Sequence, residues 1–286
     1  MPVLIRYPSI QINSLRFSAG EMHVHLEKLP EEKPEKIILR ADIHSSDDLM
    51  VLLLTHSALQ NHYGEDLVIH LEMPYFPYAR QDRVCAVGQA FSLSVIAKII
   101  SDLKVNVLTI WDAHSPVATA LTKARNITQE EIIASNKKLV SHLRDENTVL
   151  VCPDKGAREK SQAVREKFSV NEMINAEKVR NPATGKIIDT RLEAGDLSGK
   201  KAIIIDDICD GGRTFIEIAK KLKERNIERV ILYISHGIFS KGLDVFEGLI
   251  DEIYTSNSFP QMENPKLTVI DDADFVMEKG VIKNEL

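Results

Sequence analysis

The stretch K-K-A-I-I-I-D-D-I-C-D-G-G-R-T, residues 200–214, decides the fold. Ala202–Ile205 is a continuous apolar run rich in β-branched residues, which is typical of a strand buried on both faces of a parallel sheet. The run ends at two carboxylates, Asp206 and Asp207. A helix is predicted from about Thr214 onward. Its apolar residues recur at helical spacing, at Phe215, Ile218, Ala219 and Leu222. This order of strand, polar loop and helix predicts a ligand site, since open α/β sheets bind ligands beyond the carboxyl ends of their strands.

Three carboxylates and two glycines in the loop indicate the kind of ligand. Gly211 and Gly212 let the backbone N–H groups turn inward, which forms an anion nest backed by a helix N-terminus. Asp206 and Asp207 would repel a bare phosphate, but they can accept hydrogen bonds from sugar hydroxyls, directly or through Mg²⁺. The loop therefore predicts a phosphorylated sugar. The alternative is an acidic turn in which Asp210 caps the helix, although a cap needs one oxygen and not three carboxylates.

Composition limits the class of protein. The chain has 286 residues, of which 44% are hydrophobic, so one large or two small domains with an ample core are expected. The net charge of −6 provides no basic footprint for nucleic acid. No apolar run approaches the roughly 18 residues that a membrane span needs, and the N-terminus lacks signal-peptide architecture. Three cysteines without metal-ligand spacing are typical of free thiols in a reducing cytoplasm: Cys85, Cys152 and Cys209. We therefore expect a cytoplasmic protein that binds neither nucleic acid nor membranes.

The plan of strand, polar loop and helix recurs along the chain. Strands are predicted at Leu67–Leu71, Val105–Trp111 and Leu150–Cys152, and a polar loop follows each of them. This recurrence predicts an α/β fold with two tandem domains, residues 1–142 and 143–286, each a largely parallel sheet flanked by helices. That the last residues pack back on the first domain stays an open alternative.

Several motifs together resemble a known family. Residues 200–214 resemble the phosphoribosyl-diphosphate (PRPP) binding motif of the type I phosphoribosyltransferase fold, and the wider chain resembles ribose-phosphate diphosphokinases. Six further segments carry the second resemblance: F-S-A-G-E at 17–21, P-Y-F-P-Y-A-R-Q-D-R at 74–83, W-D-A-H at 111–114, C-P-D-K-G-A at 152–157, K-V-R at 178–180 and H-G-I-F-S at 236–240. Each segment is a weak signal alone, but six in the family's order around the PRPP motif form a strong one. The chain contains no Walker loop with the required spacing and no G-x-G-x-x-G.

The resemblance implies a reaction and a division of labour. In the family, the 1-hydroxyl of ribose 5-phosphate attacks the β-phosphorus of ATP, and Mg²⁺-dependent transfer of a diphosphoryl group gives PRPP and AMP. It implies two phosphoribosyltransferase-like domains, with ATP on the N-terminal side and ribose phosphate on the C-terminal side. It also implies a homo-oligomer, from dimer to hexamer. Two other functions stay open: a phosphoribosyltransferase, which would share only the central motif, and a catalytically silent regulatory homologue.

Catalytic and metal-associated positions follow from the same resemblance. Lys178 and Arg180 match residues that stabilise charge on the transferring phosphates, which cations on a closing loop can do once water leaves. Without the resemblance, their polar segment, residues 177–188, predicts only a solvated loop or hairpin. His114 and Asp154 match the metal-associated positions, although His114 taken alone is better explained as a histidine bonded within a loop.

Substrate contacts are implied by residue. The resemblance implies ATP contacts for Phe17, Glu21, Arg80, Gln81, Asp82 and His114. It implies ribose-phosphate contacts for Asp206, Asp207, Asp210, Gly211, Gly212, Arg213 and Thr214. For Phe17, the alternative is an ordinary place in the core.

Two departures from the family pattern bear on specificity. Ala19 replaces the family's aspartate in the F-S-A-G-E segment, which removes one expected adenine contact. The loop D-G-G-R-T has lost a hydroxyl at Gly211 and carries Arg213 at a glycine position. Added space and an added cation would suit a 5′-group larger than a monophosphate, such as the diphosphate of ADP-ribose, whose product would be ADP-ribose 1-diphosphate. The alternative is that Arg213 points to solvent and the acceptor is unchanged.

Overall fold

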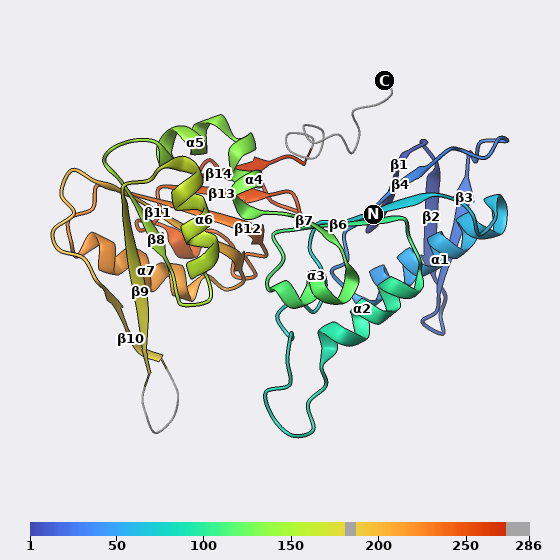
Figure 1. Cartoon of the computed structure of the whole chain (residues 1–286), viewed down its shortest axis with the longest axis horizontal. Helices are drawn as coiled ribbons and strands as arrows, with labels where there is room; N and C mark the ends of the chain where they lie inside the picture. The colour runs from blue at the N-terminus through green and yellow to red at the C-terminus, as the bar shows by residue number, and fades with distance from the viewer. Residues whose placement is uncertain (181–186, 273–286) are drawn as a thin grey trace. The chain divides into compact units, whose positions relative to one another are not determined.

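The structure, a computed structural model, describes residues 1–180 and 187–272, without the side chains of residues 178–180 and 187–190 (Figure 1). The chain divides into two compact units, Met1–Ile127 and Thr128–Leu286. The expectation that the last residues return to the first domain falls on residues 273–286, which lie outside the described part. Each unit is an α/β body, and this confirms the predicted fold class.

Unit 1 is built on a sheet of strand order β1-β4-β5-β6-β7. The first strand runs antiparallel to its neighbour, whereas the other neighbours are parallel. A separate hairpin, β2-β3, precedes the parallel part. The bounds are β1 (Val3–Tyr7), β2 (Gln11–Arg16), β3 (Met22–Glu27), β4 (Ile37–Ala41), α1 (Ser46–Tyr63), β5 (Ile69–Met73), α2 (Ser92–Asp102), β6 (Val107–Trp111), α3 (Pro116–Thr122) and β7 (Arg125–Ile127).

Unit 2 contains a sheet of order β10-β9-β8-β11-β12-β13-β14, parallel except for the pair β10 and β9. Helices lie on both of its faces in Figure 1. The bounds are α4 (Gln129–Ser135), α5 (Lys137–Leu143), β8 (Thr148–Cys152), α6 (Arg158–Phe168), β9 (Glu172–Arg180), β10 (Ile187–Leu192), β11 (Lys201–Cys209), α7 (Arg213–Lys223), β12 (Arg229–Gly237), a 3₁₀ turn at Asp244–Phe246, β13 (Glu252–Ser256) and β14 (Leu267–Ile270).

The central strand and helix of unit 2 form for the reasons that their sequence gives. Ala202–Ile205 is fully buried within β11, which has parallel partners on both sides, β8 and β12. The apolar stripe of α7 is also buried: its members are Phe215, Ile218, Ala219 and Leu222. An apolar run without alternation is what a strand covered on both faces requires. The predictions of a buried strand and of a helix starting near Thr214 are confirmed.

The strand β11 is longer than the sequence predicted. It does not end at Asp206 but runs to Cys209, because β12 continues beside it and pairs Asp206 with Ile234 and Cys209 with Gly237. The loop proper therefore begins at Asp210. Successive strand residues point to opposite faces of the sheet. Asp206 and Asp207 are neighbours of this kind, yet they stay close, because Asp206 Oδ1 accepts the Asp207 N–H at 2.9 Å.

The division between the units lies after Ile127, earlier than the sequence-based boundary at residue 142. Two short helices, α4 and α5, consequently belong to unit 2. α4 contacts α6, and α5 contacts β8. A capping box of Thr128 and Glu131 opens α4, so the chain starts a new element directly after β7.

Among the described residues, no helix combines the length and the apolarity that are needed to cross a membrane.

A buried carboxylate at the amino end of β13 ties α5 to the sheet. Glu252 accepts hydrogen bonds from the hydroxyl of Tyr254 at 2.6 Å and from Lys138 Nζ at 2.7 Å, and it pairs with Arg229. Burial opposes ionisation of Glu252, but the hydrogen bonds from Lys138 and Tyr254 and the charge of Arg229 outweigh it and lower the pKa of Glu252 to about 2. The ionised form is therefore stabilised by folding.

This shift predicts how stability depends on pH. Because the folded pKa lies below the ordinary value of 4.5, the stabilisation by Glu252 is fully present above pH 4.5 and is lost as pH falls toward 2. Glu252→Gln should lower the free energy of unfolding at pH 7 by up to about 3 kcal/mol, because each unit of the pKa shift corresponds to about 1.36 kcal/mol. The difference from the wild type should shrink at pH 3.5, as measured by urea unfolding at both pH values. An equal difference at both would contradict the prediction.

Candidate functional site

The glycine loop, residues 210–214, connects β11 to α7 at the carboxyl edge of the sheet in unit 2. Gly212 adopts a φ of 76°, a left-handed conformation that favours glycine. A Cβ built on Gly212 would lie 2.6 Å from the ring of Phe246, so the backbone sits directly on that ring. Asp210 is held from the other side, because Ser240 Oγ donates to its Oδ1 at 2.6 Å. The loop is thus fixed in shape before any ligand binds.

Two strand ends bring carboxylates together beside the glycine loop. β8 and β11 are parallel neighbours, so Asp154 follows one strand at the edge where Asp206 and Asp207 lie on the other. Burial first, and then the charge of Asp207, raise the pKa of Asp206 well above its ordinary value, and Asp154 adds to this effect. The structure therefore brings three carboxyl groups to one edge of the sheet, where the sequence predicted a sugar site.

The backbone around Asp154 is ordered by its own side chain. Asp154 Oδ1 accepts hydrogen bonds from the N–H groups of Gly156 at 2.9 Å and Ala157 at 3.2 Å. Cys152 donates its thiol to the Asp154 carbonyl at 3.1 Å. These bonds fold residues 153–157 into a tight turn that leads directly into α6.

The strand β9 extends beyond this edge of the sheet. Asn175 of β9 is level with Cys152 of β8, and β9 continues to Arg180. Lys178 lies three residues past that level, which corresponds to roughly 10 Å of extended chain. Its backbone pairs with Thr190 of β10. The side chains of Lys178 and Arg180 lie outside the described part, as do residues 181–186. Where it is described, the segment predicted as a loop or hairpin is an antiparallel hairpin.

In unit 1, the residues expected to bind ATP follow β5 and β6. Asp82 is buried and forms a bidentate pair with Arg83, at 2.7 and 2.9 Å. Hydrogen bonds from Arg83 lower the pKa of Asp82 against the opposing effect of burial, and Ser115 and the charge of His114 lower it further. The structure therefore brings the loop after β5 to the loop after β6. Gln81 accepts from Ser92 Oγ at 2.6 Å, and Arg80 is exposed.

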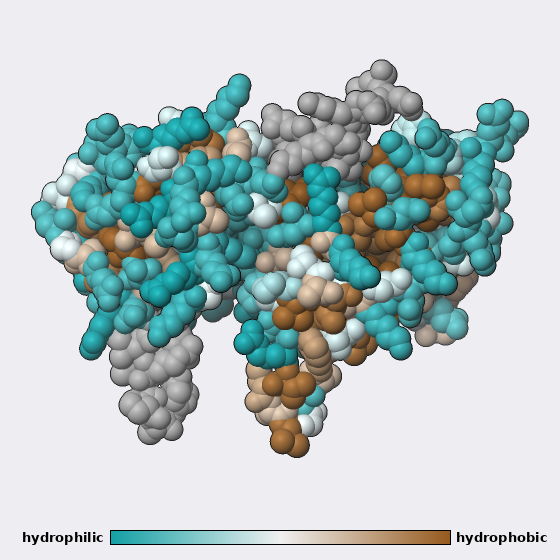
Figure 2. Space-filling view, viewed as in Figure 1, coloured by the Kyte–Doolittle hydropathy of each residue, from teal (hydrophilic) through white to brown (hydrophobic). Residues whose placement is uncertain are grey.

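The loop after Arg83 projects from unit 1. Its residues are exposed, Val84 and Val87 among them, and Figure 2 shows apolar surface on the projecting loop. The nucleotide-binding segment expected from the sequence thus runs into an apolar, solvent-facing loop before α2.

The F-S-A-G-E segment, which is expected to contact adenine, is the turn of the hairpin that joins β2 and β3. Phe17 donates its N–H to the Glu21 carbonyl at 2.8 Å, which closes the turn. The Phe17 side chain is 51% exposed and stands 5.7 Å from the ring of His23. This exposure excludes the alternative of an ordinary core residue. It leaves an aromatic ring available for stacking on a ligand.

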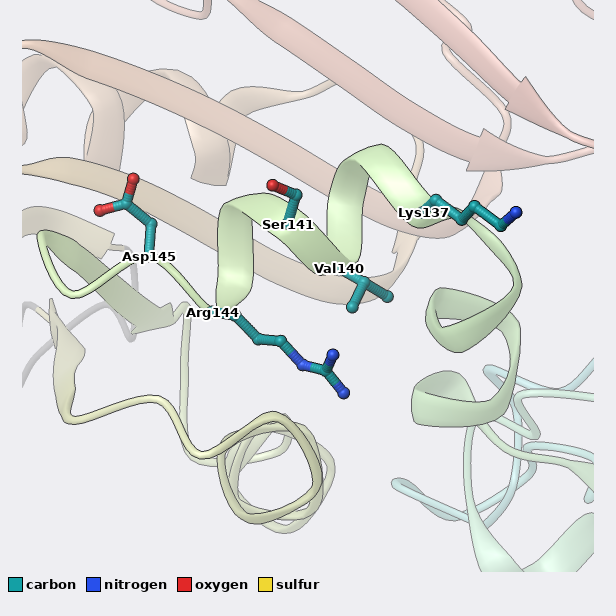
Figure 3. A pocket seen from close by; sticks show the side chains of 5 residues that line it. All are labelled: Lys137, Val140, Ser141, Arg144 and Asp145. Carbon is teal, nitrogen blue, oxygen red and sulfur yellow. The ribbon is translucent and has the colours of Figure 1, made fainter.

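A pocket of about 550 Å³ lies along α5. Figure 3 shows Val140 and Arg144 on one side of the helix and Ser141 on another. α5 precedes the amino end of β8, whereas ligands of parallel sheets bind beyond the carboxyl ends. We therefore do not assign a substrate to this pocket.

The donor set in unit 2 fits Mg²⁺ only as a partial site. Within residues 1–180 and 187–272, no group of three or more His, Cys, Asp or Glu side chains could hold a metal ion. Mg²⁺ usually keeps several waters and binds through one or two carboxylates plus substrate phosphates. One or two of the carboxyl groups of Asp154, Asp206 and Asp207 would suffice for this mode of binding.

Comparisons with known proteins agree with this geometry. A family model described as "N-terminal domain of ribose phosphate pyrophosphokinase" matches residues 4–103, and one described as "Phosphoribosyl transferase domain" matches residues 120–248. The ribose-phosphate pyrophosphokinase of Mycoplasmopsis pulmonis is 27% identical over 260 residues, 89% of this chain and 78% of that protein. The enzyme of the same name from Pyrococcus abyssi is 29% identical over 271 residues, 92% of this chain and 88% of that protein.

The chain belongs to the ribose-phosphate pyrophosphokinase family. It is an enzyme, a ribose-phosphate diphosphokinase. The crystal structure of phosphoribosylpyrophosphate synthetase from Mycobacterium smegmatis has the same fold, with a TM-score of 0.79 at 21% identity, over 94% of this chain and 89% of that one. The prediction of two phosphoribosyltransferase-like domains is confirmed.

Two cations near the glycine loop of this pyrophosphokinase were missed by the sequence analysis. Lys160 of α6 donates to Asp207 Oδ2 at 3.1 Å. The side-chain carbons of Lys241 lie 3.5 to 3.8 Å from a Cβ built on Gly211. Both contacts join residues that are far apart in the sequence, and no periodic or motif signal marks either lysine.

Proposed function

We propose that this enzyme transfers the diphosphoryl group of ATP to the 1-hydroxyl of ribose 5-phosphate and releases PRPP and AMP. The observation that supports it most is the arrangement at the carboxyl edge of unit 2. There the glycine loop, the carboxylates of β11 and the turn at Asp154 occupy one edge, and β9 extends past it. An anion nest beside carboxylates is the chemistry that a phosphorylated sugar needs.

In this proposal the two ends of the acceptor bind to different groups. The N–H groups of the glycine loop and of the first turn of α7, with Thr214, bind the 5′-phosphate. Asp206 and Asp207 accept hydrogen bonds from the ribose hydroxyls. ATP binds to unit 1 through Arg80, Gln81 and Asp82, with Phe17 and Glu21 on the adenine.

During transfer, the ribose O1 forms a bond to the β-phosphorus, and the bond from that phosphorus to the oxygen it shares with the α-phosphate breaks. AMP leaves with that oxygen, and the hydroxyl proton is released. Lys178 and Arg180 stabilise the negative charge on the transferring group. His114 of unit 1 and Asp154 of unit 2 are each proposed as metal-associated positions, and bound Mg²⁺ would neutralise phosphate charge.

We further propose that the protein is a cytoplasmic homo-oligomer, between dimer and hexamer. Large apolar side chains that are exposed on the β1–β3 region support this, among them Leu4, Tyr7, Leu15 and Phe17. Such side chains gathered on one region mark contact surfaces more often than solvent-facing ones.

A second acceptor is favoured by the added charge at the glycine loop. Arg213 begins α7 and is exposed, and Lys241 lies against Gly211. Two cations beside a loop that already binds one phosphate would suit a diphosphate. The candidate is ADP-ribose, which presents the same ribose 1-hydroxyl and would give ADP-ribose 1-diphosphate.

One experiment tests both acceptors. The purified enzyme is incubated with ATP and either ribose 5-phosphate or ADP-ribose, and AMP and the product masses are followed by liquid chromatography and mass spectrometry. AMP with PRPP supports the first proposal, and AMP with ADP-ribose 1-diphosphate supports the second. If no AMP is released with ribose 5-phosphate or with ADP-ribose, both proposals are refuted.

Variants of the two cations then test the reason for the second acceptor. Arg213→Gly and Lys241→Met should each raise KM for ADP-ribose about tenfold, because each removes a charge-assisted hydrogen bond. KM for ribose 5-phosphate should change less. Lys266→Met, which removes an exposed pair with Glu247, is the control. Equal effects on both acceptors would contradict the proposed role of these cations.

A further inference from the structure

An ion pair links α6 to the strand that carries the acceptor carboxylates. Lys160 Nζ lies 3.1 Å from Asp207 Oδ2, and the two side chains are 24% and 10% exposed. Lys160 is the third residue of α6, which begins directly after the turn held by Asp154 Oδ1. The pair therefore joins the ends of two neighbouring strands, β8 and β11, at the edge where the sugar is proposed to bind.

A gain in fold stability is a poor explanation for this pair. Taking two charges out of water costs several kcal/mol, which their attraction offsets only partly, so a buried pair is weak evidence for a stabilising role. The same strand offers a comparison at its amino end, where Lys201 pairs with Asp145 at 2.7 Å. Those side chains are 23% and 37% exposed, similar to Lys160 but distant from the glycine loop.

The position of Lys160 has a consequence for Asp207. A carboxylate that accepts a hydrogen bond from an ammonium group on one oxygen has its plane fixed, while each oxygen carries two acceptor lone pairs. A ribose hydroxyl needs an acceptor in a fixed direction if its 1-hydroxyl is to be aligned for attack. Asp207 also stands beside Asp206, whose Oδ1 accepts the Asp207 N–H at 2.9 Å, and at the same edge of the sheet as the turn of Asp154.

We propose that Lys160 is a positioning residue for the sugar acceptor, which acts by fixing the carboxylate of Asp207 toward the ribose hydroxyls. The inference rests on the proposed function, because it presumes a ribose-bearing acceptor. Lys160 itself need not touch the substrate. It holds Asp207 in the orientation in which its carboxylate accepts a hydrogen bond from a ribose hydroxyl. Loss of Lys160 should therefore weaken binding of the sugar acceptor and not of ATP.

The test compares three variants of the full-length enzyme: Lys160→Met, Lys160→Arg and Lys201→Met. KM for the acceptor, KM for ATP and kcat are measured for each, with the acceptor that the wild type uses. Lys160→Met should raise KM for the acceptor by about tenfold to a hundredfold, which is the range expected when the Asp207 carboxylate loses its hydrogen bond to the ribose hydroxyl. KM for ATP should stay within about twofold. Lys160→Arg should restore most of the acceptor affinity, because it keeps the cation.

The outcomes separate the inference from the function on which it rests. A wild type inactive with both acceptors refutes the proposed function itself. An active wild type, with Lys160→Met unchanged, or with both KM values raised equally, overturns the role of Lys160. So does a Lys201→Met variant that shows the same change in acceptor KM. Thermal melting checks folding, and Lys160→Gln replaces Lys160→Met if the latter does not melt cooperatively.

Discussion

Lys178→Ala is expected to lower kcat by about a hundredfold to a thousandfold, since the loss of one group that stabilises transition-state charge has an effect of that size. Lys178 lies on β9 past the carboxyl edge of the sheet, and the proposal assigns it to the transferring phosphates. KM for ATP and the melting temperature should change little, because the charge develops only during transfer. Turnover at saturating ATP and acceptor, with equilibrium binding of ATP, measures both.

Lys220→Ala is the control for this variant. Lys220 lies on α7 in an exposed pair with Glu217, so its loss removes a positive charge from unit 2 without touching the edge of the sheet. Its kcat should equal that of the wild type. A near-normal kcat for Lys178→Ala would contradict the catalytic role proposed for Lys178. A low kcat for Lys220→Ala would show that the loss of one positive charge from unit 2 is enough to explain the effect.

Gly212→Ala should have the second largest effect, on both stability and acceptor binding. A left-handed backbone costs a non-glycine residue about 1–2 kcal/mol. The new methyl group would also lie 2.6 Å from Phe246 Cζ. Overpacking of this kind costs about 1–3 kcal/mol, so the free energy of unfolding should fall by about 2–5 kcal/mol. Acceptor KM should rise at least tenfold, because the loop cannot keep its N–H groups in place.

Gly242→Ala separates the two causes. Gly242 has a similar φ of 71°, but nothing lies within 4 Å of a Cβ built on it. The free energy of unfolding of Gly242→Ala should fall only by the cost of backbone strain, about 1–2 kcal/mol, and the variant should keep its affinity for the acceptor. Guanidinium unfolding and acceptor kinetics of both variants decide the matter. If the two alanine variants behave alike, contact with Phe246 does not hold the loop.

The sequence predicted those features that are encoded locally. The spacing of Phe215, Ile218 and Leu222 is a property of α7 alone, and the apolar run of β11 needs no knowledge of its neighbours. The structure confirms both. Asp154 and Asp207 come to one edge as expected, because the carboxyl ends of parallel strands share an edge.

Features that depend on a partner could not be predicted in this way. β11 continues past Asp206 because β12 pairs with it, and nothing in the sequence of β11 reports the length of its neighbour. The boundary after Ile127 depends on where α4 and α5 dock, which their own periodicity does not reveal. The pair of Lys160 and Asp207 joins residues 47 positions apart, so only the fold brings them together.

Because Gly212 packs against Phe246, the sugar-binding segment at residues 200–214 does not keep its shape by itself. The groups assigned to ribose 5-phosphate lie on β11, in the glycine loop and in the first turn of α7, yet the Phe246 ring that supports the turn belongs to a 3₁₀ segment some thirty residues later, beyond another strand. A fragment that contained only this segment would include the groups that bind ribose 5-phosphate but would lack the Phe246 ring that supports the turn. A segment transferred to another protein must therefore extend to Phe246, and not only to the residues that contact the acceptor.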